Sequence, residues 1–111
     1  MKIAFTSKGK EWDSEVEPRF GRADYILVYD TDTESRECID NTSIRDVEHG
    51  AGPKTAKLIL DLNPSVLVTG NGPGGNAARV LEKANVEILT GYGDKPILDT
   101  CMNLIKELSD K

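Results

Sequence analysis

Residues 69–77, Thr-Gly-Asn-Gly-Pro-Gly-Gly-Asn-Ala, form the stretch of the chain best suited to bind an anionic ligand. Glycine leaves the backbone almost unscreened, so N–H groups there can approach a ligand closely. The stretch contains four glycines, Gly70, Gly72, Gly74 and Gly75. A helical pattern follows, which adds free N–H donors and the positive end of a helix dipole. Taken alone, however, the stretch is explained better as a tight strand-to-helix turn, since its spacing matches neither the P-loop nor the dinucleotide-binding fingerprint.

Two further stretches carry groups that could complete such a site. Residues 19–22 place two guanidinium groups beside a glycine, and residues 49–52 place the single histidine of the chain before two glycines and a helical pattern. Guanidinium groups bind anions through planar forks of donors, and an imidazole nitrogen is a good ligand for iron or molybdenum. The candidate cofactor-binding residues are Ser7, Arg19, Phe20, Gly21, Arg22, Gly50, Gly52, Gly70, Gly72, Gly74 and Gly75, with His49 as the metal ligand.

Each of these side chains also has an ordinary structural explanation. A histidine before glycine is often a helix-cap or loop residue, and the two arginines lie close in sequence to four acidic residues with which they could form surface ion pairs. Cys38 could face either core or solvent, whereas Cys101 lies on an apolar helical stripe and is better explained by packing. Ser7 has no evident base in sequence, although His49 could approach it in a cleft.

The composition restricts the class of protein. The chain has 111 residues, enough for one domain over 1–111, and a net charge of −5, which argues against a nucleic-acid partner or an anionic membrane surface. No apolar run approaches the ~20 residues that span a bilayer. Only two cysteines occur, which suits the cytoplasm and supplies neither a disulfide framework nor the four thiolates of a permanent iron–sulfur centre. We found no convincing catalytic signature and expect a protein that is not an enzyme.

The elements that must position these residues follow from hydrophobic patterning. Strands are predicted over 2–6, 25–30, 35–41, 66–69 and 86–89, and helices from about 51 to 62, from about 77 to 84 and from 96 to 108. Residues 8–24 and 41–48 are predicted to be polar connections, the first of them long. The order of elements predicts an α/β fold with a five-stranded mixed sheet, spatial order 3-2-1-4-5, flanked by helices.

This topology predicts that the three glycine-containing stretches meet. The first, third, fourth and fifth strands would run the same way, so the junctions that follow them would lie at one edge of the sheet. Residues 19–22, which precede the antiparallel second strand, would lie at that edge too. Ligands of open α/β sheets usually bind outside the carboxyl ends of the strands.

The three stretches, in this order and context, resemble the dinitrogenase iron–molybdenum cofactor biosynthesis family over nearly the whole chain. The resemblance implies a ribonuclease H-like three-layer fold and transient, non-enzymatic carriage or storage of an iron–sulfur or iron–molybdenum-type cluster. It also implies a link to nitrogen fixation and to cluster-assembly or acceptor proteins. The sequence lacks the clustered cysteines and appended domains of larger members, which supports cluster binding more than nitrogenase assembly itself.

Two other functions stay open at this point. The same glycine-rich loops could bind a small molecule or an oxyanion, as in a metabolic sensor, without any metal. A small hydrolase using Ser7 and His49 is a third hypothesis. The exposed, polar third strand leaves self-association open, and the sequence does not specify an oligomeric state.

Overall fold

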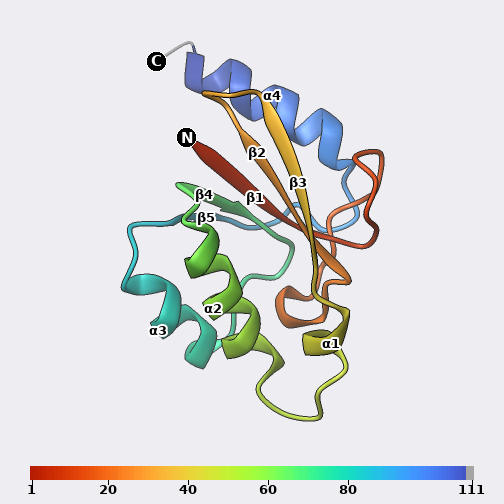
Figure 1. The fold of residues 1–111 in the computed structure, drawn as a ribbon, viewed down its shortest axis with the longest axis vertical. Helices are drawn as coiled ribbons and strands as arrows, with labels where there is room; N and C mark the ends of the chain where they lie inside the picture. Colours follow the sequence, from red (N-terminus) through yellow and green to blue (C-terminus); the bar gives the residue numbers. More distant parts are fainter. Residues whose placement is uncertain (110–111) are drawn as a thin grey trace.

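A five-stranded mixed sheet forms the middle layer of the protein, for which we analysed a computed structural model that describes residues 1–109 (Figure 1). The last two residues of the domain predicted over 1–111 lie outside this range. The strand order is β3-β2-β1-β4-β5, as predicted. The strands are β1 (Lys2–Ser7), β2 (Tyr25–Asp30), β3 (Ser35–Asp40), β4 (Val66–Val68) and β5 (Glu87–Leu89). Only β2 runs antiparallel to the others, since β1 pairs with it antiparallel and with β4 parallel.

Helices cover both faces of the sheet, so the fold has three layers. The helices are α1 (Thr42–Arg45), α2 (Ala51–Leu62), α3 (Gly75–Glu82) and α4 (Ile97–Ser109), with a short 3-10 helix, η1 (Phe20–Arg22). On one face, α2 and α3 pack side by side, and Ile59 and Leu81 bury against Ala4 and Leu67 of the sheet. On the other face, α4 packs against Phe5. Both cores form because β1 and β4 alternate apolar side chains to the two faces.

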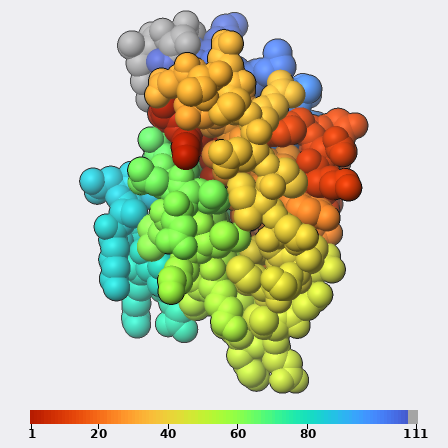
Figure 2. Space-filling model, in the orientation of Figure 1, coloured from red at the N-terminus to blue at the C-terminus, as the bar shows by residue number. Residues whose placement is uncertain are grey.

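The segment between β3 and α2 differs from the prediction of a polar connection. Residues 42–45 form α1, because Asp40 accepts hydrogen bonds from the backbone N–H and the hydroxyl of Thr42. The guanidinium of Arg45 binds the carboxylate of Asp24 and so fixes this helix beside the start of β2. The chain that follows α1 projects at the lower end of the molecule in Figures 1 and 2. This projection holds the stretch predicted to carry the metal ligand.

The long connection 8–24 is ordered by contacts along its length. Val16 is fully buried and forms an isolated bridge with Ser7, while Glu15 bridges to Pro96 before α4. Trp12 packs edge-on against the ring of Phe5, 5.9 Å between centroids. Trp12 and Val16 therefore belong to the core on the α4 face, whereas Phe20 and Ala23, later in the connection, are buried in the core on the face of α2 and α3. No helix among the described residues is long and apolar enough to cross a membrane.

Candidate functional site

An open pocket of about 470 Å³ lies where the three glycine-containing stretches meet. Its walls come from η1 with the preceding Arg19, from the start of α2, and from the loop between β4 and α3. The residues that line it are Arg19, Phe20, Gly21, Arg22, Gly50, Ala51, Gly52, Pro53, Asn71, Gly72, Gly74 and Asn76. Eight of the twelve residues predicted for the site are in this set. The convergence predicted from the strand order is therefore present in the structure.

The start of α2 forms one wall. Gly50 caps the helix with φ of +80°, a conformation that residues with a side chain rarely adopt, and its carbonyl accepts the first helical hydrogen bond from Lys54. The first N–H groups of a helix have no partner within it, so those of Ala51 and Gly52 are available donors. Pro53 has no N–H, and it fits the first turn for that reason. The α2 start therefore presents uncharged donors and the positive end of a helix dipole.

The loop from β4 to α3 forms the opposite wall. Asn71 donates its backbone N–H to the carbonyl of Pro18, 2.8 Å away, which ties this loop to the segment before η1. Gly72 takes φ of +86°, and Gly74 caps α3, accepting from Ala78 at 2.8 Å. The first N–H groups of α3 are then free to bind a ligand, as in other helix N-termini that bind anions. Two helix N-termini thus border one pocket.

The two arginines have different surroundings. The Arg19 side chain is 70 % exposed and its guanidinium lies 3.9 Å from the carboxylate of Glu17, a weak surface pair. Arg22 donates from one guanidinium nitrogen to two main-chain carbonyls, those of Arg45 and Val47, the second at 2.9 Å. Arg22 therefore anchors the chain between α1 and α2, a role that the sequence did not suggest. Arg19 is the lining arginine with a guanidinium exposed to solvent.

Four predicted residues lie outside the lining. Ser7 is fully buried, and its hydroxyl donates to the carbonyl of Gly9 at 2.5 Å. Gly70 is packed against Pro18, where a Cβ would lie 2.4 Å from the Pro18 Cα. Gly75 begins α3, next to the lining residues Gly74 and Asn76, and His49 is exposed in the projecting segment, next to Gly50. The structure thus does not bring the hydroxyl of Ser7 into the pocket.

Four lining residues were not among the predicted ones: Ala51, Pro53, Asn71 and Asn76. Each is a direct neighbour of a predicted glycine in sequence. The signal that could have found them is their place inside the loops, since a loop that lines a pocket contributes neighbouring residues as well as its glycines. Asn71 and Asn76 add amide groups that can donate to an anion.

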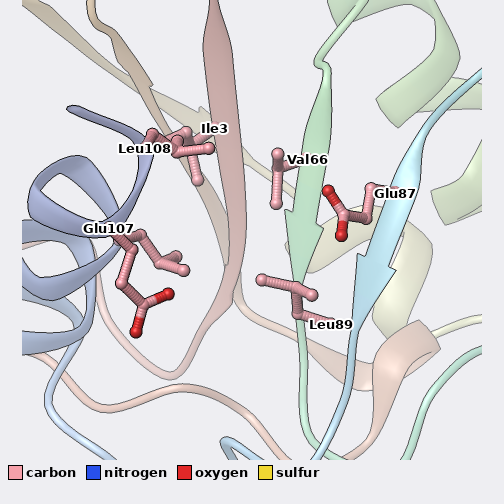
Figure 3. Close-up of a pocket in the computed structure, with 7 residues that line it drawn as sticks. Ile3, Val66, Glu87, Leu89, Glu107 and Leu108 are labelled. Carbon is pink, nitrogen blue, oxygen red and sulfur yellow. The ribbon is translucent and has the colours of Figure 1, made fainter. Parts of the chain in front are cut away.

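The charge of the lining favours an anionic ligand. It contains two arginines and no aspartate or glutamate. A second pocket, of about 80 Å³, lies between α4 and the sheet, and its lining contains two glutamates and no basic side chain. Figure 3 shows Glu107 from α4 and Glu87 from β5 on its two walls, among apolar side chains. That acidic, apolar pocket does not suit an anion.

Metal-ligating side chains are not gathered in the part of the chain that the structure describes. No group of three or more His, Cys, Asp or Glu side chains there could hold a metal ion. Cys38 is exposed on β3, and Cys101 is buried in α4, where desolvation raises the pKa of its thiol to about 11. Any metal group bound at the lined pocket would be held mainly through hydrogen bonds and charge.

The fold and the pocket define a small three-layer α/β protein with a glycine-lined pocket whose lining contains two arginines and no acidic side chain. The family described as dinitrogenase iron-molybdenum cofactor matches residues 1–107, and the chain belongs to this family. A comparison with curated protein sequences gives no significant match.

Solved structures resemble this fold over almost its whole length. The apo form of the orange protein from Desulfovibrio gigas is 29 % identical, with a TM-score of 0.86 over 96 % of this chain and 88 % of that one. A Thermotoga protein described as a candidate NifB protein of the DUF35 family is 30 % identical, with a TM-score of 0.74 over 96 % and 87 % of the two chains.

Proposed function

We propose that this protein binds, carries or stores an anionic iron–sulfur or iron–molybdenum-type cluster, or its precursor, without catalysing a reaction. One observation carries the proposal: two helix N-termini and an exposed guanidinium border one pocket whose lining contains no acidic side chain. The family supports an association with such a cofactor. The orange protein, whose structure is an apo form, supports the binding of a removable group.

Transient binding fits this pocket better than permanent ligation. A resident iron–sulfur cluster usually has about four thiolate ligands, whereas neither of the two cysteines is among the lining residues and one of them is buried. Hydrogen bonds from backbone N–H groups can hold sulfide or carboxylate groups and release them without breaking a metal–ligand bond. Exposed His49, next to Gly50, is our proposed protein ligand to the metal.

The wider features of the proposal follow from the family. Cluster-assembly or acceptor proteins would deliver and receive the cargo, nitrogen fixation would be one setting, and the cytoplasm one location. The strand order and the antiparallel β2 support a ribonuclease H-like fold.

The first test is anaerobic incubation with ferrous iron and sulfide, followed by desalting and by analysis of bound metal, sulfide and visible absorption. Gly74→Glu places a carboxylate at the pocket, where a Cβ meets nothing within 4 Å. We expect about tenfold less bound iron than in wild type because like charge repels the cluster. Asn103→Glu, on the exposed side of α4, adds the same charge elsewhere and should bind as wild type does. Equal uptake by all three proteins would contradict the assignment of the pocket.

His49→Ala separates the two ways of holding a cluster. Reduced iron uptake in this variant would support a histidine ligand. Unchanged uptake would mean that the cluster is held by hydrogen bonds and charge without the histidine. A wild-type protein that binds neither iron nor sulfide would contradict cluster binding.

A metal-free oxyanion or small molecule is the second candidate, favoured by the lack of acidic or thiol ligands in the lining. It predicts that phosphate, molybdate or a nucleotide raises the thermal unfolding temperature of wild type and not of Gly74→Glu. The absence of any shift with these three probes would count against it.

A further inference from the structure

The outer edge of β3 is an unpaired strand edge in the described residues. β3 lies at the end of the sheet, next to β2 only, and five of its six residues are exposed. Figures 1 and 2 show it at the surface of the molecule, with no helix over it in this view. An unpaired edge presents N–H and C=O groups that can pair with another strand.

The register of the sheet shows which groups face outward. The backbone N–H of Asn41 donates to the backbone carbonyl of Asp24, and the backbone N–H of Thr31 donates to the backbone carbonyl of Met1. These two bonds show which residues of β2 bond to β3 and which bond to β1. Because backbone groups alternate along a strand, residues 35, 37 and 39 of β3 direct theirs to β2. The N–H and C=O groups of Arg36, Cys38 and Asp40 therefore point away from the sheet.

The side chains of the same three residues form a self-complementary pattern. They share one face of β3, since successive side chains alternate between faces. The Arg36 guanidinium lies over the Trp12 ring, 5.3 Å from its centroid. Hydrogen bonds from Thr42 lower the pKa of Asp40, so its carboxylate is charged at neutral pH. A positive and a negative side chain thus flank Cys38 at equal separation along the strand.

We propose that β3 pairs antiparallel with β3 of a second copy of this chain, about a two-fold axis at Cys38. In this register the outward groups of all three residues find partners. Arg36 lies opposite the partner's Asp40, Asp40 lies opposite the partner's Arg36, and Cys38 lies opposite the partner's Cys38. On the other face, Glu37 lies opposite the partner's Ile39, so no like charges are directly opposed.

The neighbouring registers are less favourable. A two-fold axis at Glu37 would set this carboxylate against the partner's Glu37, and like charges directly opposite are destabilising. An axis at Ile39 would leave Arg36 opposite the partner's Thr42, without its ion pair. Charged residues on an edge strand normally discourage pairing with another strand. In β3 they disfavour the registers with an axis at Glu37 or Ile39 and favour the register with an axis at Cys38. The interface is small, so we expect a weak dimer that forms at high protein concentration.

Oxidative trapping tests both the interface and its register. Two thiols that face each other form a disulfide when an added oxidant such as diamide accepts two electrons and two protons. Facing residues of a hydrogen-bonded antiparallel pair have Cα atoms about 5.5 Å apart, within the range of disulfides. We expect a covalent dimer linked through Cys38, and none in Cys38→Ser, because Cys101 is buried.

Moving the thiol along the strand tests the axis. In the Cys38→Ser background, Ile39→Cys keeps Arg36, Glu37 and Asp40 and should form dimers about tenfold more slowly than Cys38 does in wild type. Faster trapping at position 39 than at position 38 would overturn the proposed register, and no trapping at either position would overturn the interface.

Charge reversal supplies a second, independent test. Arg36→Glu should slow trapping about tenfold because it sets two carboxylates opposite each other in both cross-strand pairs, whereas Arg36→Lys keeps the positive charge and should trap at nearly the wild-type rate. Circular dichroism checks that each variant is folded. Sedimentation of reduced Cys38→Ser should still show a dimer at high concentration. Trapping that is unaffected by Arg36→Glu, or a Cys38→Ser protein that stays monomeric up to millimolar concentration, would overturn the proposal.

Discussion

Gly21 and Gly52 approach each other backbone to backbone beside the pocket: a Cβ on Gly21 would lie 2.7 Å from the main-chain nitrogen of Gly52. This contact joins η1 to the first turn of α2. It explains why a glycine is needed between the two arginines, which the sequence alone presented as part of an anion-binding motif. Its function is to let two segments meet closely enough to form one wall.

Gly21→Ala should destabilise the protein, because the added methyl group must displace backbone and not a flexible side chain. Overpacking of this kind costs about 1–3 kcal/mol of the free energy of unfolding, measured by urea titration. Gly75→Ala is the matched control. Its Cβ meets nothing within 4 Å and it begins α3, so stability should stay constant or rise by up to ~1 kcal/mol. Equal stability of the two variants would show that η1 moves freely.

Gly70→Ala should be destabilising for a similar reason, at the other wall. Its Cβ would lie 2.4 Å from the Cα of Pro18, whose carbonyl also binds Asn71. We expect a loss of about 1–3 kcal/mol and faster exchange of the Asn71 amide hydrogen, followed by NMR. Slow exchange in the variant would mean that the Asn71 hydrogen bond survives the substitution.

Arg22→Lys should loosen the projecting segment while keeping the charge. A lysine ammonium is a strongly hydrated point charge on a flexible stem, so it should hold the carbonyls of Arg45 and Val47 less firmly than the rigid guanidinium nitrogen that binds both. The loss should be about 1–2 kcal/mol of the free energy of unfolding, with faster amide exchange in residues 46–50. Arg19→Lys is the control, because the exposed Arg19 makes only a weak pair with Glu17. Matching exchange rates in the two variants would contradict the anchoring role of Arg22.

Cys101 should make stability depend on pH in the alkaline range. Burial raises the pKa of its thiol from 9.0 to about 11, so the folded state favours the protonated form. This contribution is complete below about pH 9 and is lost as the pH rises through about 11. The free energy of unfolding of wild type should therefore fall more steeply than that of Cys101→Ala between these values. If the free energies of unfolding of the two proteins, measured by urea titration at each pH, fell in parallel, the proposed effect of Cys101 would be contradicted.

The fold was largely predictable because each strand and helix carries a clear local pattern. The predicted strand order is confirmed, since the short-connection and handedness rules leave few ways to arrange this sequence of elements. Boundaries differ by one or two residues, and the prediction lacked α1 and η1, both of which lie in stretches predicted to be connections. Residues 42–45 lack an apolar stripe, and their helix depends on Asp40 at one end and on the pair between Arg45 and Asp24.

The sequence by itself determined which segments would form the pocket. Glycines and a proline specify tight turns locally, and the direction of each strand follows from the order of elements, so the three stretches had to meet at one edge of the sheet. Only the tertiary structure decided what each side chain does there. Whether Ser7 is buried, Arg22 anchors a loop, and Gly21 permits a close contact depends on neighbours distant in sequence, and no local pattern encodes those distances.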